Sequence, residues 1–600
     1  MGSDMKQYLG ALAVAAGLSA FSADGQIIPT NRLPGGQGWF GVVGIPGGIP
    51  NRTTIFTNMA AGSSLSAVQN ALNICPSNQV VMLASGSYSF ANSLIVPTGV
   101  TLRGAGMGQS VINAGVNGLP VIQIGLAPSA TIINTNISQA VSGGIASGAT
   151  NFTVSNPANF VAGELVTLTE LNDSTIPVTD AGDSGTCTWC DPWSGIRGLG
   201  QTVEVTSVNG STVNFAPFAY TTYSNSLSPN ATPFAEAARY AGVEDLTVYA
   251  ASTNTGVNFY MGAAAYCWLY NVEGNFTGAD HVEIVSGYRC QVDHSYFHDA
   301  FIHGPGTYDE CLMLDWKSSG CLVEDNIFWR LHTSVIVNRG SSGNVIAYNY
   351  STNSYLSGNT NFMTIDMDLC HGSHTAWNDA EGNVCGNLIS DSIWGSSSHS
   401  TFLRNFCSGD GFYSYPPDVR YGASTATPLP APTKLLIYPG RQVYAEVGIW
   451  PSDLASYFNI VGNIIGDSYV GSDSSTVYES TTAGLYSAIP YEILAGASTS
   501  GSTGTYTSHV TNTMILAGNW DAKKKVQTWP SGAQTISNSY YLGSKPAFFG
   551  NRNWPPFDPS NPSKCFDTNI PAAYRFFTGN DPTNSGTPPL TPSGLRILGL

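Results

Sequence analysis

Two aspartates in the segment 364–374 have the spacing of a chemically active pair. If this segment is a β-strand, Asp366 and Asp368 point to one face with Cβ atoms about 7 Å apart, and the apolar residues around them face the core. Two such carboxylates can hold Ca²⁺, or they can act as the acid and base of an inverting glycosidase. A solvated acidic face without any chemistry explains them equally well.

Histidines gather around the same segment. The chain has nine, and all except His509 lie between residues 281 and 399. Histidine is the side chain best suited to proton transfer or metal binding near neutral pH. His371 and His374 invite a zinc interpretation, although a tetrahedral site needs more ligands than the sequence identifies. Hydrogen bonds to the backbone of a turn explain this pair as well, so both remain candidates together with His332 and His399.

Strands that end in a polar residue recur along the chain and must position these side chains. The intervals fit one coil of about 23 residues, lengthened in places by a loop. The repeated position is occupied by Asp245, Asn271, His294, Asn326, Asn349, Asn383 and Asn405. A column of this kind can form a hydrogen-bonded ladder, as stacked Asn residues do in cross-β structures. We therefore interpret His294 as structural.

The same register relates Trp377 to His399. Each lies six residues before its column residue, so the two rings should stack on adjacent coils. An aromatic ring beside a histidine on an exposed ledge suits sugar binding, whereas packing under a loop is the alternative. Trp377 and Arg404 are the candidate substrate-binding residues.

The cysteines add predictions that depend on register. Cys187-Thr-Trp-Cys190 predicts a local loop disulfide rather than a zinc half-site, because no second such motif exists. Two further pairs occupy equivalent positions on adjacent coils and should stack about 4.8 Å apart, within reach of a disulfide bond. They are Cys267 with Cys290, and Cys385 with Cys407.

Composition and charge narrow the class of protein. With 66 Gly and few helix-forming runs, the chain reads as all-β. Its net charge of −17 disfavours nucleic acid as a partner. Residues 1–25 read as a signal peptide whose apolar run is too short to span a bilayer, so we expect no membrane insertion. The mature protein is expected to be a monomer that is secreted, periplasmic or held at the cell surface.

Residues 64–106 carry the strongest fold signal. A short amphipathic helix over residues 64–72 precedes several short strands, including Gly86-Ser-Tyr-Ser-Phe90 and Gly99-Val-Thr-Leu-Arg-Gly-Ala-Gly106. This run resembles the N-terminal cap and first coils of right-handed parallel β-helices of the pectate-lyase-like superfamily. The resemblance implies a single-stranded right-handed parallel β-helix, an all-β fold, with an N-terminal capping helix.

Patterning along the rest of the chain divides this domain, residues 26–600, into four parts. Residues 60–145 form the N-terminal cap and first coils, and residues 146–220 read as an inserted β-rich module. Residues 240–465 form the central coils. Residues 466–600 hold Ser/Thr/Gly-rich loops and a C-terminal cap, which we expect to seal the open end of the last coil.

The resemblance also implies a substrate class. Exported proteins of this superfamily act mostly on polysaccharides, as lyases or hydrolases, in a groove along the coils. A lyase removes a proton next to a uronate carboxylate and neutralises that carboxylate. Lys317, His332 or Arg339 can be the base, with Asp366 and Asp368 as Ca²⁺ ligands.

The sequence lacks both the polygalacturonase motif set and the Arg-x-Pro-x-x-Arg pattern of pectate lyases, so the resemblance assigns no catalytic residue. We predict a polysaccharide-acting protein with its groove across residues 290–405, a lyase more than a hydrolase. A non-catalytic adhesin is the competing class.

Overall fold

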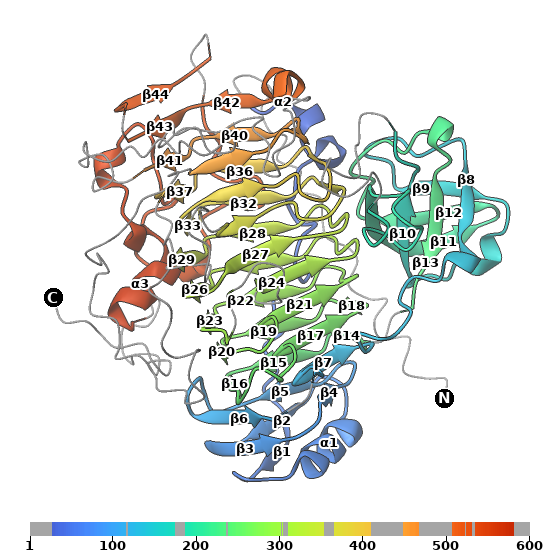
Figure 1. Cartoon of the computed structure of the whole chain (residues 1–600). Coiled ribbons are helices and arrows are strands. Elements are labelled where there is room, and N and C mark those ends of the chain that lie inside the picture. Colours follow the sequence, from blue (N-terminus) through green and yellow to red (C-terminus); the bar gives the residue numbers. More distant parts are fainter. Residues whose placement is uncertain are drawn as a thin grey trace.

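Short parallel strands stacked coil upon coil build the protein. The computed structural model describes residues 27–115, 118–173, 187–235, 238–301, 303, 310–352, 354, 365–409, 448–466, 507–522, 524–530 and 535–580. Each complete coil contributes one strand to each of three long sheets, so the chain winds as the right-handed parallel β-helix predicted from the sequence (Figure 1). The predicted signal peptide lies outside the described residues.

The three sheets account for most of the strands. The first contains, in spatial order, β1 (Ile55–Met59), β2 (Val80–Leu83), β5 (Thr101–Arg103), β15 (Gly242–Glu244), β19 (Trp268–Tyr270), β22 (Gln291–Asp293), β25 (Leu322–Glu324), β28 (Val345–Ala347), β32 (Asp379–Glu381), β36 (Thr401–Leu403), β40 (Asn459–Val461) and β42 (Ile515–Ala517). The second contains β3 (Gly86–Phe90), β6 (Ser110–Ala114), β16 (Thr247–Ala250), β20 (Glu273–Asn275), β23 (Tyr296–His298), β26 (Ile327–Trp329), β29 (Tyr350–Thr352), β33 (Val384–Cys385), β37 (Phe406–Cys407), β41 (Ile464–Ile465), β43 (Asn519–Asp521) and the antiparallel β44 (Val526–Thr528). The third, which carries the candidate site, contains β38 (Ile449–Pro451), β34 (Leu388–Ser390), β30 (Met367–Asp368), β27 (Thr333–Val337), β24 (Glu310–Asp315), β21 (Val282–Val285), β17 (Phe259–Gly262), β7 (Ile122–Gly125) and β4 (Leu94–Val96). Two short parallel sheets add β14 (Ala238–Arg239) with β18 (Ala264–Ala265), and β31 (Thr375–Ala376) with β35 (Ser397–Ser398) and β39 (Ala455–Ser456).

An asparagine ladder fixes the register between the first and second sheets. Within it, the Nδ2 of Asn349 donates to Oδ1 of Asn383 and the Nδ2 of Asn383 donates to Oδ1 of Asn405, both at 3.0 Å. The ladder runs through Asn326, Asn349, Asn383, Asn405, Asn463 and Asn519. The predicted polar ladder is therefore confirmed from Asn326 to Asn405, and it continues beyond the predicted column to Asn463 and Asn519.

The predicted column is off by one at its N-terminal end. Asp293 pairs with Glu324, so His294 stands beside Asp325, and Ser295 holds the rung below Asn326. Because Asp325 and Asn326 are both polar, the sequence pattern alone did not separate the two columns. Nδ1 of His294 donates to Oδ2 of Asp325 at 2.9 Å, and the ring stacks on Tyr270, which agrees with a structural role.

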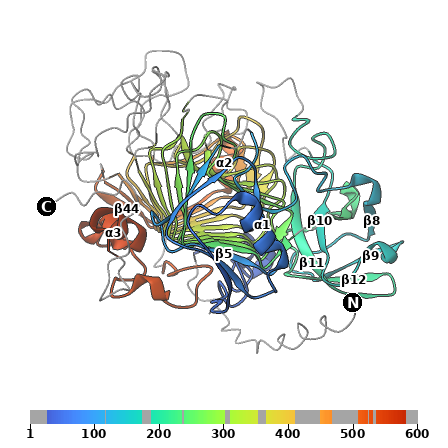
Figure 2. The same cartoon turned by 90° about the horizontal axis from the view of Figure 1, so that it is seen from below.

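A helix covers the N-terminal end of the coils. α1 (Leu65–Ile74) begins at Ser64, whose hydroxyl accepts a hydrogen bond from the Ala67 amide, and buries Val68 and Leu72 in the main core. Figure 2 shows α1 lying across the open end of the first coils. Neither α1 nor the two other helices, α2 (Thr507–Thr513) and α3 (Pro571–Thr578), is long and apolar enough to cross a membrane, and these are the α-helices of the described residues.

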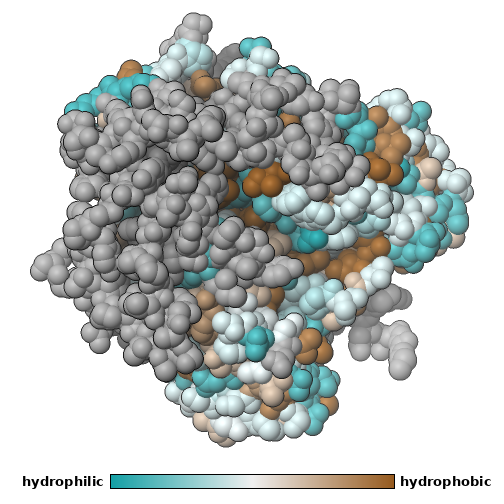
Figure 3. Space-filling view, viewed as in Figure 1, coloured by the Kyte–Doolittle hydropathy of each residue, from teal (hydrophilic) through white to brown (hydrophobic). Residues whose placement is uncertain are grey.

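The inserted module is a closed antiparallel barrel of six strands. It consists of β8 (Gln139–Ser142), β9 (Asn151–Val154), β10 (Leu165–Thr169), β11 (Gly200–Asn209), β12 (Thr212–Ala216) and β13 (Asn230–Pro233), so it extends beyond residues 146–220 at both ends. The module stands as a lobe beside the coils, and brown patches in Figure 3 mark apolar residues on its surface. Val161 and Ile196 are among its exposed apolar side chains.

The C-terminal residues pack along the flank of the coils. Described residues 535–580 return past the last coil, and α3 lies beside β26 and β29 (Figure 1). Arg575 of α3 forms a buried ion pair with Asp325 at 2.5 Å, and the Phe576 ring contacts the Tyr350 ring at a tilt, with centroids 5.2 Å apart. Residues 535–580, expected to cap the last coil, instead cover the side of the stacked coils. The aromatic residues there bury the apolar outer faces of the first two sheets.

The cysteine predictions are confirmed in part. Cys187 and Cys190 form a disulfide, and Cys385 pairs in register with Cys407. Cys267 and Cys290 directly precede the paired residues Trp268 and Gln291, so they stack as predicted. None of these four core cysteines is bridged, and the sulfur atoms of Cys385 and Cys407 are 3.9 Å apart.

Candidate active site

The third sheet presents Asp368 at the centre of an apolar row. Met367 and Leu369 are buried in the main core, so Asp368 on β30 points to the outer face, as the alternation predicted. Its register partners on β27 and β34 are Ile336 and Ile389. Although it faces outward, Asp368 is only 1% exposed. An ionised carboxylate in this position is poorly solvated.

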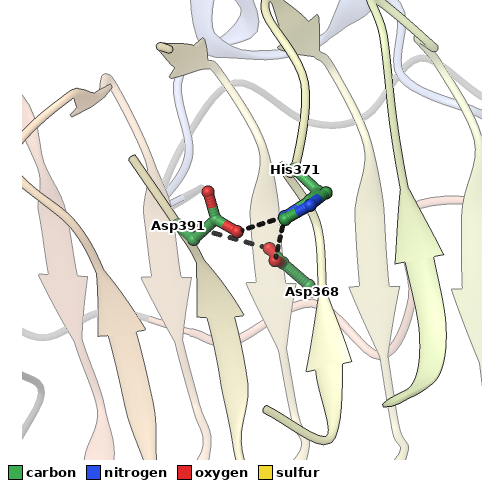
Figure 4. A group of neighbouring side chains, drawn as sticks. All are labelled: Asp368, His371 and Asp391. Carbon is green, nitrogen blue, oxygen red and sulfur yellow. Dashed lines mark hydrogen bonds and ion pairs between the residues drawn. The ribbon is translucent and has the colours of Figure 1, made fainter. Parts of the chain in front are cut away.

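Asp391 lies beside Asp368, one coil later. It directly follows β34, and its backbone N–H donates to Oδ1 of Asp368 at 3.3 Å. His371, three residues after Asp368, places Nδ1 2.6 Å from Oδ2 of Asp391 and 3.9 Å from Oδ2 of Asp368. The three facing side-chain atoms lie within 4.8 Å of one another (Figure 4). We call these three residues the acid cluster.

The two carboxyl groups of the acid cluster share a proton most favourably. Asp368 Oδ2 accepts no hydrogen bond from an N–H or hydroxyl among the described residues, and it faces the Asp391 carboxyl group. Burial raises the pKa of Asp368 well above its usual range, and the charge of Asp391 and a hydrogen bond with Asp391 raise it further. The backbone amides of Cys370 and Asp391 oppose this shift only in part. The raised pKa favours a proton on Asp368.

This arrangement can perform acid–base chemistry on a bound substrate. A protonated carboxyl can give its proton to a leaving group. A neighbouring carboxylate held by a histidine can then attack the substrate as a nucleophile or activate a water molecule as a base. The His371 side chain is 26% exposed, whereas those of both aspartates are 1% exposed. The histidine therefore marks the side from which solvent reaches the cluster.

Sequence reasoning missed Asp391, although a signal for it existed. Asp368 pairs with Ile389, so the coil repeat places Asp391 two residues beyond the register partner of Asp368 on the neighbouring coil. Cys370 and Asp391 are equivalent in the register of β30 and β34. A search for acidic residues one coil away from Asp368 would have found it.

Asp366 does not belong to the acid cluster. Its Oδ1 accepts hydrogen bonds from the hydroxyls of Ser334, Ser351 and Ser354 at 2.8, 2.5 and 2.7 Å. Its Oδ2 accepts the Gly386 amide at 2.7 Å. These donors satisfy the buried carboxylate without a cation, so they fit a structural role at the corner before β30.

The ligand atoms available around Asp366 and Asp368 fit Ca²⁺ poorly. Asp366 is already saturated, and Asp368 instead faces a carboxyl and an imidazole. Ca²⁺ prefers an all-oxygen set of six to eight ligands, whereas the acid cluster offers two carboxylates and one ring nitrogen. The Ca²⁺ assignment stays a prediction.

Arg339 and Lys317, two of the predicted bases, bind other groups of the protein. Arg339 forms a two-pronged ion pair with buried Asp315, through Nε at 2.6 Å and through Nη2. The ammonium of Lys317 donates to the carbonyl oxygens of Arg197, at 2.9 Å, and Gly198 in the inserted module. Burial lowers the pKa of Lys317 to about 8, and nearby carboxylates oppose the shift. Lys317 is thus a buried anchor between module and coils, 1% exposed.

The remaining candidates lie away from the acid cluster or inside the packing. His332 directly precedes β27, whose Ile336 pairs with Asp368, so it lies roughly 13 Å away along the strand direction. His374 hydrogen-bonds to the hydroxyls of Ser396 and Ser398 at 2.7 and 2.8 Å. Burial lowers its pKa to about 3, so it is a neutral structural residue.

The predicted stack of Trp377 and His399 is confirmed, with ring centroids 4.2 Å apart. Trp377 is only 5% exposed and contacts the inserted module, so the stack is packing and not an open ledge. Arg404 donates to the carbonyl oxygens of Phe557 and Ser537, both at 2.8 Å, and anchors the C-terminal segment. Neither Trp377 nor Arg404 reaches solvent as a substrate-binding residue would.

Neither a protein-family model nor a curated protein sequence matches the chain. Similar solved structures include the tailspike of Acinetobacter baumannii bacteriophage AP22 in complex with capsular saccharide, at 13% identity and a TM-score of 0.38, covering 67% of this chain and 63% of that one. The tailspike of Pseudomonas phage LKA1 has the same identity and TM-score and is covered over 69% of its length. The polygalacturonase of Erwinia carotovora ssp. carotovora is 11% identical, with a TM-score of 0.31 over 69% of this chain and 93% of that one. The likeness is one of fold.

Proposed function

We propose that this protein is a glycoside hydrolase that cleaves a polysaccharide at the acid cluster. The observation that carries the proposal is the buried Asp368–Asp391 pair, in which burial and the Asp391 carboxyl raise the pKa of Asp368 and His371 holds Asp391 at 2.6 Å. Hydrolysis of a glycosidic bond needs one carboxylic acid and one carboxylate at the same time. Two aspartates in unequal surroundings supply both.

The roles follow from the surroundings of each carboxyl. Asp368 protonates the leaving glycosidic oxygen, and Asp391 attacks the anomeric carbon to form a glycosyl ester. Once Asp391 is esterified it carries no charge, so the pKa of Asp368 falls and its carboxylate can activate the incoming water. The facing oxygens lie within 4.8 Å, short of the 6.5–9.5 Å gap of inverting enzymes. We therefore expect retention of the anomeric configuration.

The lyase interpretation has weaker support. A lyase needs a base near the uronate carbon and a cation for its carboxylate. Arg339 and Lys317, the predicted sources, are engaged with Asp315 and with backbone carbonyls. A hydrolase needs neither of these cations, so the acid cluster favours hydrolysis.

A polysaccharide screen with two product assays tests the proposal. The intact protein is incubated with neutral and uronate-containing polysaccharides, and reducing ends and ultraviolet absorbance of unsaturated ends are followed together. We expect new reducing ends without absorbance, and loss of about 10²–10⁴-fold in rate for Asp368→Asn and for Asp391→Asn. Glu324→Gln is the matched control, since Glu324 is also a buried acid with raised pKa but lies on the first sheet.

Other outcomes would reject the assignment. Unsaturated ends would show a lyase, and full activity in Asp391→Asn would remove the pair from the mechanism. Binding of a polysaccharide without any product would favour the adhesin class.

A further inference from the structure

A disulfide-closed loop of the inserted module carries an exposed tryptophan. Trp189 lies between Cys187 and Cys190, which are bonded, and it is 36% exposed. The buried carboxylate of Asp191 holds the following turn by accepting three backbone amides, those of Trp193, Gly195 and Arg197, at 2.6, 3.1 and 2.7 Å. The loop therefore presents the indole from a rigid support.

One tryptophan of the coils contacts this ring, and a second shares Arg339 with it. Trp394 contacts Trp189 edge to face, with ring centroids 5.2 Å apart. The guanidinium of Arg339 lies 5.6 Å from the Trp189 ring and 4.7 Å from the ring of Trp316. All three indoles are at least partly exposed. We call Trp189, Trp316 and Trp394 the tryptophan platform.

The tryptophan platform adjoins the acid cluster. Trp394 comes three residues after Asp391, and the intervening Ile393 amide donates to Oδ1 of Asp391 at 2.9 Å. On the other side, a Cβ placed on Gly372, the residue after His371, would lie 2.8 Å from Cγ of Arg339. The platform and the acid cluster are therefore linked along the chain through Trp394, and they approach in space where Gly372 lies beside Arg339.

We propose that the tryptophan platform binds a pyranose unit of the polysaccharide next to the bond that is cleaved, an inference that rests on the proposed hydrolase. An aromatic face covers the apolar face of a sugar ring, and a rigid ring loses little entropy on binding. The inserted module thereby supplies a substrate-binding residue to a site built on the coils.

The charges around the platform favour an uncharged sugar. Arg339, the cation beside Trp189 and Trp316, is neutralised by Asp315, and the neighbouring acid cluster contributes Asp391 as a carboxylate. A uronate bound here would meet a carboxylate without gaining a free cation. The substrate class is therefore a polysaccharide with neutral pyranose units at this subsite.

Binding measurements on an inactive variant test the platform separately from catalysis. Asp368→Asn protein, which keeps the Asp391 carboxylate, is titrated with soluble xylan, galactomannan, mixed-linkage β-glucan, polygalacturonate and alginate, with binding followed by affinity electrophoresis. We expect binding to at least one neutral polysaccharide, weakened about tenfold or more by adding Trp189→Ala and less by Trp189→Phe. Trp529→Ala is the matched control, because Trp529 is 37% exposed and lies after β44, in the C-terminal part of the chain.

The outcomes separate the two proposals. Trp189-dependent binding without any reducing ends from the native protein supports the platform and rejects the hydrolase. Hydrolysis whose KM is unchanged in Trp189→Ala supports the hydrolase and rejects the platform. Equal binding in Trp189→Ala, binding of uronates alone, or no binding to any of the five polysaccharides overturns the platform as well.

Discussion

Replacing Asn383 by alanine removes a rung from the middle of the asparagine ladder. Its Nδ2 donates to Ile346 O at 2.8 Å and to Asn405 Oδ1 at 3.0 Å. Its Oδ1 accepts the backbone N–H and the Nδ2–H of Asn349, both at 3.0 Å. The residue is 0% exposed, so water cannot readily replace these bonds.

The cost follows from the donors left behind. Asn383→Ala leaves the backbone N–H and one Nδ2–H of Asn349 buried without their acceptor, and each unpaired group costs roughly 1–3 kcal/mol. The free energy of opening this turn should fall by about 4 kcal/mol, which corresponds to about a thousandfold faster amide exchange. A cooperative unfolding curve is a poor measure for stacked coils, because neighbouring coils can open separately.

Hydrogen exchange of a peptide that contains residues 345–352 measures this opening, with the melting temperature as a second reading. Asn383→Ser is the matched control: Ser295 occupies the equivalent rung below Asn326, and its hydroxyl accepts the Val272 amide at 3.2 Å. Serine should therefore recover about half of the loss, since it restores an acceptor for the backbone amide. If alanine and serine exchange equally fast, or if alanine costs under about 1 kcal/mol, the ladder does not hold the turn as argued.

Two buried cations give opposite pH dependences. Burial lowers the pKa of Lys317 to about 8. Between pH 8 and the pKa of lysine in the unfolded chain, the unfolded state binds more protons than the folded state, so stability rises with pH by up to about 3 kcal/mol. Lys317→Met should lack this rise when melting temperatures are compared at pH 7.5 and 10. Burial alone would lower the pKa of His298, but hydrogen bonds with Asp299 and Glu273 outweigh it and raise the pKa to about 9. The stabilisation by protonated His298 is complete below about pH 6.5 and is lost as the pH rises to 9. His298→Gln should therefore remove a fall in folding stability of about 3 kcal/mol over that window. A pH profile like that of the native protein in either variant contradicts the pKa shift assigned to the replaced residue.

Local patterns were enough to predict the coils. The period of about 23 residues, the polar ends of strands and the helix over residues 64–72 each depend on neighbours in sequence or one coil away. The ladder from Asn326 to Asn405, the stacking of Trp377 on His399 and the pairing of Cys385 with Cys407 follow from that period. Register was ambiguous only where two polar residues, Asp325 and Asn326, stand side by side.

The site needed information that the period does not contain. Lys317 reads as a free base in the sequence, yet its ammonium is fixed by carbonyl groups about 120 positions earlier, in an inserted module. Arg404 is likewise fixed by a C-terminal segment more than 130 residues away. Such contacts depend on how insertions fold back on the coils, which strand alternation does not encode.

A comparison of Asp366 and Asp368 shows why the second is the better candidate for chemistry. Both are buried acids on the same face, and both oxygens of Asp366 accept hydrogen bonds from hydroxyl or amide donors. Asp368 instead stands in a row between Ile336 and Ile389, with one oxygen turned to another carboxyl. An unpaired buried carboxylate costs stability, and a structural role would have been met more cheaply by an amide or an apolar side chain. A cost of this kind is typical of sites where function opposes stability, because an acid that keeps its proton near neutral pH is what bond cleavage requires.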